Sequence, residues 1–199
     1  MSQDHLVTWR DRERRRLIDL RGALPGAVRA EHDRQIRSLL QEVLPEVRGL
    51  TIAGYWPIRG EPDIRPFLHR LAEAGAIAAL PAVDTPASAL VFRAWKREEP
   101  LVRDLRNLPA PASTMPTVQP DVLLIPVVGF DSVGFRLGYG GGYFDRTLAE
   151  ASARPRAIGV GYSVSRMPTV RPQPHDVPMD LIVTEAGISN PTREDSDTA

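Results

Sequence analysis

The alternation of short apolar runs with helical segments between residues 51 and 184 most constrains what this chain can fold into. The longest run, residues 122–128, predicts a buried central strand. Because strands that alternate with helices form a mostly parallel sheet with both faces covered, the sequence predicts an α/β fold. Further strands are predicted at residues 51–56, 77–81, 89–95, 157–162 and 180–184, with 89–95 antiparallel at an edge, and helices at 8–21, 27–44 and 63–74.

A glycine-rich turn follows the central strand, between Arg136 and Arg146, and leads into a helical segment. Four of the five residues 138–142 are glycine. A strand, a glycine-rich turn and a helix start together form a common phosphate site, because backbone N–H groups point at the anion. The spacing fits neither a Walker loop, which needs a Gly-Lys pair, nor the dinucleotide fingerprint, which would need glycine at Tyr143. The alternative is a turn that only connects the strand to the helix.

Composition excludes several classes of function. The chain has 199 residues, which suits one domain, and it has no cysteine, so disulfides, thiolate catalysis and cysteine-bound zinc are excluded. The net charge is zero, which gives no overall attraction to nucleic acid. No apolar run approaches the roughly 20 residues of a membrane span, and the N-terminus does not resemble a secretory signal. We therefore expect a cytoplasmic protein with no nucleic-acid or membrane partner.

Two segments are predicted to be irregular. Residues 97–120 contain five prolines, and a loop of this length in a compact domain is typically a lid or a binding loop. The alternative is a segment that wraps an edge of the domain. Residues 186–199 are polar and lack apolar periodicity, which predicts a disordered tail.

Arginines crowd the first half of the predicted helix 8–21. Arg10 and Arg14 are four residues apart, so their side chains share one side of the helix and can reach a single polyphosphate. The alternative is an ordinary solvated helix face.

The ordered block formed by residues 127–131 and 134–146 resembles the 5-formyltetrahydrofolate cyclo-ligase family. Residues 59–63, 80–81 and 174–180 add to the resemblance, which covers residues 10–185. It implies a single three-layer α/β/α domain over residues 1–185. It also implies conversion of 5-formyltetrahydrofolate to 5,10-methenyltetrahydrofolate with ATP and Mg²⁺, releasing ADP and phosphate. In that reaction ATP phosphorylates the formyl oxygen, N10 attacks the activated carbon and phosphate departs.

The resemblance also implies roles for residues of this chain. The positions that match ATP-binding residues are Arg10, Arg14, Arg136, Leu137, Gly138, Tyr139, Gly140, Gly141, Gly142, Tyr143 and Phe144. Those that match the folate pocket are Trp56, Glu61, Tyr139, Gly140, Gly141, Gly142 and Tyr143. Arg136, Tyr143 and Asp145 match catalytic positions, and Asp145 and Asp180 match Mg²⁺ ligands, for which carboxylate oxygens are suited.

Each carboxylate and the tryptophan also has a purely structural alternative. In these alternatives, Glu61 caps a helix and Asp145 is stabilised in the first turn of a helix by the helix dipole. Asp180 is the first residue of a strand, and Trp56 packs in the core.

The chain departs from the family pattern at two positions. Ala110 stands where many members carry an acid before the central strand, and Phe144 replaces a frequent tyrosine. Loss of a carboxylate near the folate pocket bears on the choice of substrate more than on the nucleotide chemistry. The alternatives are a divergent member acting on another formyl or amide substrate, or a non-catalytic protein that binds folate or nucleotide. A regulatory or nucleic-acid role for the arginine-rich helix is disfavoured by the zero net charge. We expect a monomer.

Overall fold

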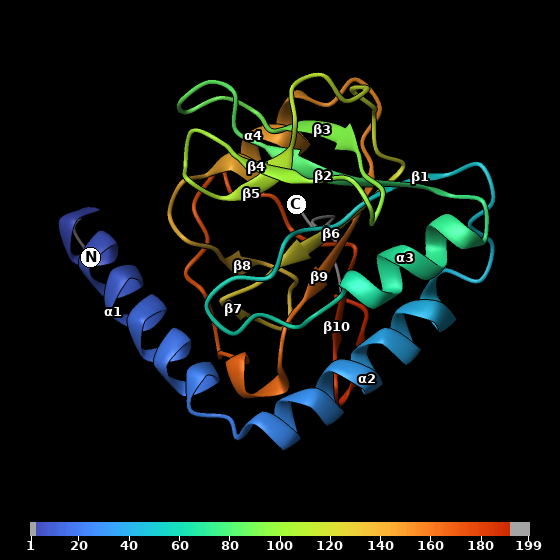
Figure 1. Cartoon of the computed structure of the whole chain (residues 1–199). Coiled ribbons are helices and arrows are strands. Elements are labelled where there is room, and N and C mark those ends of the chain that lie inside the picture. The colour runs from blue at the N-terminus through green and yellow to red at the C-terminus, as the bar shows by residue number, and fades with distance from the viewer. Residues whose placement is uncertain (1–2, 192–199) are drawn as a thin grey trace, which may run out of the picture.

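The computed structural model describes residues 3–191, and a seven-stranded sheet lies at its centre (Figure 1). The strand order is β11-β10-β9-β6-β1-β2-β3. The five inner strands run parallel, whereas β3 and β11 pair antiparallel at the two edges. The strands are β1 (Thr51–Ala53), β2 (Ile77–Ala82), β3 (Val91–Ala94), β6 (Val122–Pro126), β9 (Arg156–Val160), β10 (Leu181–Thr184) and β11 (Gly187–Ser189). The predicted α/β fold with a mostly parallel sheet is therefore confirmed.

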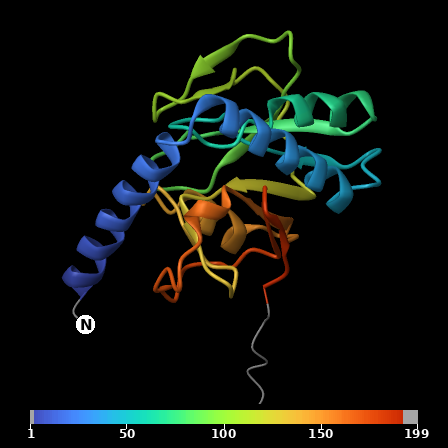
Figure 2. The same ribbon diagram turned by 90° about the horizontal axis from the view of Figure 1, so that it is seen from below.

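Helices cover both faces of the sheet, as the layered prediction requires. The helices are α1 (Gln3–Gly22), α2 (Gly26–Val43), α3 (Arg65–Glu73) and α4 (Tyr143–Glu150), with a short 3-10 turn η1 (Ser163–Ser165). Side chains of α2 and α3 pack on one face of the sheet and those of α4 on the other. Figures 1 and 2 show α1 projecting beside this body, at an angle to α2.

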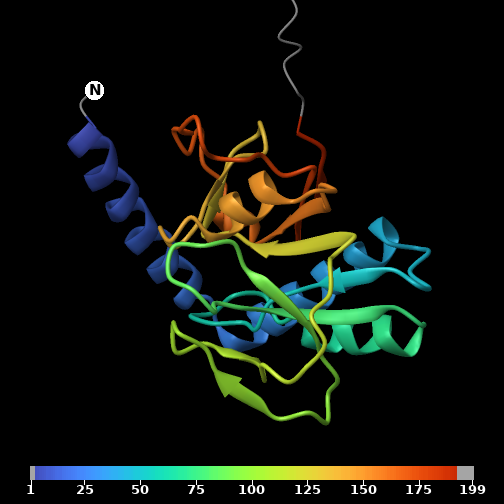
Figure 3. The same cartoon turned by 90° about the horizontal axis from the view of Figure 1, so that it is seen from above.

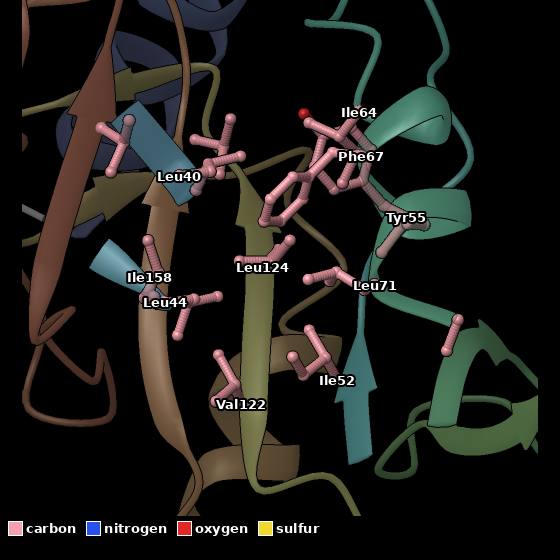
Figure 4. Packing of buried hydrophobic residues seen from close by; sticks show 14 of the residues in the cluster. Leu40, Leu44, Ile52, Tyr55, Ile64, Phe67, Leu71, Val122, Leu124 and Ile158 are labelled. Atoms are coloured by element: carbon pink, nitrogen blue, oxygen red, sulfur yellow. The ribbon is translucent and has the colours of Figure 1, made fainter. Parts of the chain in front are cut away.

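The main core forms because apolar positions recur on one side of each helix and on both sides of the inner strands. Leu124 of β6 is fully buried, and Figure 4 shows it among Phe67 of α3, Ile52 of β1 and Leu40 of α2. The strand β6 is buried along nearly its whole length, as expected for a parallel strand covered on both faces. The core thus fixes the carboxyl ends of β1, β2 and β6 at one edge of the sheet.

Two hairpins lie outside the main sheet. The segment 97–120, which was predicted to be irregular, contains the antiparallel pair β4 (Leu101–Arg103) and β5 (Pro109–Pro111). That prediction was therefore wrong in part, because proline is tolerated in an edge strand whose N–H groups need no partner. Figures 1 and 3 show this hairpin beside β2 and β3. A second pair, β7 (Gly129–Phe130) and β8 (Arg136–Leu137), leads into the glycine-rich turn.

Two other boundaries differ from the prediction. Helix α1 begins at Gln3 rather than at Thr8, whose hydroxyl bonds to the carbonyl of Asp4 inside the helix. The predicted disordered tail from residue 186 is wrong at its start, because 187–189 pair with β10 as β11. The rest of that prediction, residues 192–199, lies outside the described residues. Between residues 3 and 191, no helix is long and apolar enough to span a bilayer.

Candidate active site

A cleft of about 400 Å³ lies at the carboxyl ends of β1, β2 and β6. Ligands of open α/β sheets bind at this edge. Segments distant in sequence line it, among them the first half of α1, the loop after β1, the β4–β5 hairpin, the glycine-rich turn and the 173–177 loop. Of the predicted site residues, those that line it are Arg10, Arg14, Trp56, Glu61, Arg136, Gly138, Tyr139, Gly140, Gly141, Gly142, Tyr143, Phe144 and Asp145.

Two predicted residues do not line the cleft. The side chain of Leu137 is fully buried and packs against Leu17 of α1, so this residue supports the turn from behind. Asp180 precedes β10, at the amino end of that strand. Its Oδ2 accepts a hydrogen bond from the Ala157 N–H at 2.7 Å, and its Oδ1 lies 3.1 Å from the Arg154 guanidinium. The structure therefore does not bring Asp180 to the cleft as a second magnesium ligand, because the amino ends of parallel strands lie at the opposite edge of the sheet.

The glycine-rich turn needs glycine for its shape. Gly140 and Gly142 have φ angles of 92° and 64°, in the left-handed region that other residues rarely adopt. A Cβ atom on Gly140 would lie 3.4 Å from the guanidinium carbon of Arg14. Gly142 is the N-cap of α4, and no side chain caps the first N–H groups of this helix. The turn therefore offers uncapped N–H groups at a helix start, which suit an anion.

Helix α1 is tied to the cleft by its two predicted arginines. Arg14 donates from Nε to the Gly138 carbonyl at 2.7 Å. Arg10 donates from Nη2 to Oδ2 of Asp176 at 2.6 Å, and both side chains are only about one-tenth exposed. Both guanidinium groups thus stand on one side of the cleft, as their spacing of four residues predicted.

Arg136 and Asp145 form a partly buried ion pair behind the turn. Nη2 of Arg136 lies 2.8 Å from Oδ1 of Asp145, and Nη1 donates to the Val177 carbonyl at 2.8 Å. The same Oδ1 accepts the Val177 N–H at 3.0 Å. Burial lowers the pKa of Arg136 from its ordinary value, and the negative charge of Asp145 opposes that shift. The pair therefore joins β8, α4 and the 173–177 loop at the cleft.

A buried carboxyl group forms the other side of the cleft. Oε1 of Glu61 accepts the Tyr139 O–H at 2.8 Å and Oε2 accepts the Ile58 N–H at 2.8 Å. Arg21 in turn donates from Nη2 to the Tyr139 hydroxyl at 2.8 Å. Burial raises the pKa of Glu61 to about 7, against the pull of its hydrogen bonds and of Arg21. Glu61 is thus poised to exchange a proton near neutral pH, which a helix-capping carboxylate would not be.

This pKa predicts a pH dependence of stability. An unfolded glutamate titrates near 4.5, so the stabilisation that accompanies the raised folded-state pKa is fully present below pH 4.5 and is lost as pH rises through about 7. We expect wild-type protein to lose about 3 kcal/mol of unfolding free energy relative to Glu61→Gln over this range. Urea unfolding of both proteins at several pH values measures the difference, with the exposed Glu42→Gln as control. A difference that stays constant with pH would contradict the assignment.

Sequence reasoning missed residues in the cleft and behind it. Arg21 is almost fully buried and does not line the cleft, but it supports Tyr139 from behind through its hydrogen bond to the hydroxyl. It lies on the same side of α1 as Arg10 and Arg14, and this helical spacing was a usable signal. Asp176 and Arg106 do line the cleft. The guanidinium carbon of Arg106, in the β4–β5 hairpin, lies 6.0 Å from the centre of the Tyr143 ring. The length of segment 97–120 had indicated a lid or a binding loop, but no local pattern indicated that it would face the glycine-rich turn.

The carboxylate of Asp145 is chemically suited to hold a magnesium ion. Asp145 has one oxygen that is not engaged by Arg136 or Val177. Among residues 3–191, no group of three or more histidine, aspartate or glutamate side chains is arranged to hold a metal ion. Mg²⁺ commonly binds through one or two carboxylates, substrate phosphates and water, and such a site needs no larger cluster.

The two residues that depart from the family pattern differ in position: Ala110 lies outside the cleft lining and Phe144 lies in it. Ala110 lies in β5, paired with Val102 of β4, and its side chain is buried outside the cleft lining. A carboxylate of the same hairpin, that of Asp104, does line the cleft. Phe144 lines the cleft and packs against the core layer under α4.

The chain is similar to known proteins over most of its length. A model of the 5-formyltetrahydrofolate cyclo-ligase family matches residues 7–185. The 5-formyltetrahydrofolate cyclo-ligase of Mycolicibacterium smegmatis is 32% identical over 175 residues, covering 84% of this chain and 89% of that protein. The protein of the same name from Escherichia coli K12 is 29% identical and covers 84% of this chain and 96% of its own length.

Solved structures give the same result. A 5,10-methenyltetrahydrofolate synthetase from Mycoplasma pneumoniae superposes with a TM-score of 0.73 at 26% identity, over 88% of this chain and 98% of that chain. The 5,10-methenyltetrahydrofolate synthetase of Aquifex aeolicus, with a TM-score of 0.80 at 24% identity and 96% coverage of both chains, shows the shared fold. The chain therefore belongs to the 5-formyltetrahydrofolate cyclo-ligase family of enzymes.

Proposed function

We propose that this protein uses ATP and Mg²⁺ to convert 5-formyltetrahydrofolate to 5,10-methenyltetrahydrofolate, with release of ADP and phosphate. The observation that supports the proposal is that two opposite sides of one cleft, here called walls, carry different chemical groups. One wall has arginines and uncapped helix N–H groups, and the other has the buried Glu61–Tyr139 pair. The first suits a triphosphate and the second suits a polar heterocycle.

On the nucleotide wall, charge and geometry act together. Arg10, Arg14 and Arg136 bring three guanidinium groups to the cleft, and the first turn of α4 adds N–H groups. Guanidinium groups bind phosphate oxygens in two-point geometry, so they orient the chain of phosphates as well as neutralise it. Asp145 would hold Mg²⁺ through its free oxygen. When bound, that ion supplies further neutralisation of the phosphate charge.

On the folate wall, Glu61 accepts hydrogen bonds from the N–H donors of the pterin ring. Trp56 lines the cleft three residues after β1 and offers a flat apolar surface to a ring system. With a pKa near neutrality, Glu61 binds the ring as a carboxylate or as a carboxylic acid, according to pH. The pterin is therefore fixed before the phosphate is transferred.

The remaining chemistry needs positioning more than a protein nucleophile. The formyl oxygen attacks the γ-phosphorus of ATP, and ADP leaves. Nitrogen N10 of the same folate then attacks the formyl carbon and gives up its proton to the departing phosphate, and the C–O bond breaks to release that phosphate. Arg136 and the glycine-rich turn stabilise the charge that develops on the transferred group. Tyr143 closes the turn where the nucleotide and the folate meet.

The direct test mixes the protein with MgATP and 5-formyltetrahydrofolate and follows the absorbance of the methenyl product. We expect absorbance to rise only when ATP is present, with one ADP formed for each methenyl product. A well-folded sample that gives no signal would contradict the proposal. The monomeric state and the cytoplasmic location stay predictions.

Arg106 is expected to contribute to nucleotide binding. Asp104 fixes the tip of the β4–β5 hairpin by accepting the N–H groups of Arg106 and Leu108 through Oδ1 and that of Val83 through Oδ2. This turn holds the guanidinium of Arg106 across from Tyr143. Because an exposed charge contributes modestly, Arg106→Ala should raise the KM for ATP about three- to tenfold and leave the fold unchanged. Steady-state kinetics measure this, with Arg103→Ala on the same hairpin as control. Equal effects of the two variants would contradict a specific contact.

A further inference from the structure

A second hollow, of about 760 Å³, lies on the outer side of Trp56 between α2 and α3. We call it the arginine groove. Figure 1 shows the two helices next to each other on one face of the sheet. The residues that line the arginine groove are Arg34, Arg37, Ser38, Gln41, Trp56, Asp63, Arg65, Pro66, His69, Arg70, Glu73, Trp95 and Arg97.

The arginine groove carries an excess of positive charge. Five arginines line it, against two carboxylates, Asp63 and Glu73. One of these carboxylates is already neutralised, because both oxygens of Asp63 accept N–H groups of Arg65 at 2.8 Å. The side chains of Arg70 and Arg97, by contrast, form no ion pair or hydrogen bond with another residue in the described part of the chain, and both residues are exposed. Two exposed guanidinium groups therefore remain available to an anion.

Trp56 joins the arginine groove to the active-site cleft. Among residues 3–191, it is the one residue that lines both hollows. The guanidinium carbon of Arg65 lies 4.9 Å from the centre of a Trp56 ring, and Trp95 meets Trp56 edge-on at 6.1 Å between ring centres. Trp56 is thus held in place by stacking rather than left free. The two hollows therefore adjoin at the Trp56 side chain.

We propose that the arginine groove is a second subsite, which binds the carboxylate tail of the folate substrate. This inference rests on the proposed function. A folate carries a glutamate at the end remote from its pterin ring, and further γ-linked glutamates add one carboxylate each. With the pterin at Glu61 and the phosphates at the glycine-rich turn, Trp56 provides the route by which the tail leaves the cleft. Guanidinium groups match carboxylates in shape and charge.

The test compares 5-formyltetrahydrofolate carrying one glutamate with the same compound carrying three γ-linked glutamates. We expect the longer tail to lower KM for wild-type protein, and Arg70→Gln/Arg97→Gln to reduce this advantage about three- to tenfold. The KM for ATP and kcat should not change. Added salt should shrink the advantage in the wild type, because exposed charges are screened. The control is Arg12→Gln/Arg48→Gln, which removes two exposed charges elsewhere.

A binding measurement separates this proposal from the proposed function. Titration of each folate into the protein without ATP, followed by calorimetry, reports tail binding even if no methenyl product ever forms. A tail-length advantage that disappears in the groove variant but persists in the control supports the subsite. The proposal is overturned if tail length has no effect on wild-type affinity, if the groove variant keeps the full advantage, or if the control loses as much.

Discussion

Replacement of Arg136 by alanine is expected to lower kcat/KM for ATP by about 100- to 1000-fold, which is typical when a charge-stabilising donor is removed. The side chain of Arg136 is 5% exposed and reaches the cleft from behind the glycine-rich turn. A charge that is shielded from water acts more strongly on a phosphate than one at the surface. Affinity for the folate should fall far less, because Glu61 and Trp56 bind it on the other wall.

The measurement is steady-state kinetics combined with separate titrations of nucleotide and folate. Removing the arginine also leaves Asp145 without its partner, which destabilises the protein, so circular dichroism must first show that the variant is folded. Arg136→Lys serves as the matched variant: it keeps the charge but loses the two-point geometry that now joins Asp145 and Val177, and it should recover only part of the activity. Equal losses of ATP and folate affinity would assign Arg136 a structural role instead.

Asp145→Asn is expected to lower kcat by about 100-fold or more while the fold persists. The amide oxygen of asparagine can still accept hydrogen bonds from the Val177 N–H and from an N–H of Arg136, so the contacts that join α4 to the 173–177 loop survive. The substitution does remove the negative charge of the Asp145 carboxylate, which would hold Mg²⁺. Turnover of the variant should therefore respond little to added magnesium.

Asp180→Asn is the matched control for this variant. Asp180 bonds to the Ala157 N–H and to Arg154 at the amino end of β10, away from the cleft. We expect this variant to keep its turnover and its magnesium dependence. If Asp180→Asn loses turnover as Asp145→Asn does, the result supports the metal site formed by both Asp145 and Asp180 that was predicted from the sequence. If Asp145→Asn turns over normally, Asp145 is not a magnesium ligand.

Local patterns were enough to predict the sheet and the placement of the glycine-rich turn beside the arginines of α1. The apolar run at residues 122–128 and the glycine-rich turn after it are contiguous in sequence, so their arrangement follows from short-range geometry. The pair Arg10 and Arg14 was found for the same reason, since helical spacing fixes which residues share a side. The same rule extended along α1 reaches Arg21, which bonds to Tyr139.

Contacts between distant segments were harder to predict. Asp180 was assigned to magnesium by family resemblance alone, yet a residue that precedes a parallel strand lies at the edge opposite the cleft. Five prolines predicted an irregular segment at 97–120, because proline disfavours central strands, whereas β4 and β5 form only a small two-stranded sheet of their own. The placement of Arg106 across from Tyr143 depends on Asp104 bonding to Val83, a contact that no local pattern encodes.

The transfer of the formyl oxygen to phosphate tests the central claim most directly. The substrate would be 5-formyltetrahydrofolate with oxygen-18 in its formyl group, incubated with the protein and MgATP, and the released phosphate would be analysed by mass spectrometry. We predict that the label appears in inorganic phosphate, one atom for each methenyl group formed. Methenyl product accompanied by unlabelled phosphate would show that the oxygen leaves by another route, and would contradict phosphoryl transfer in this cleft.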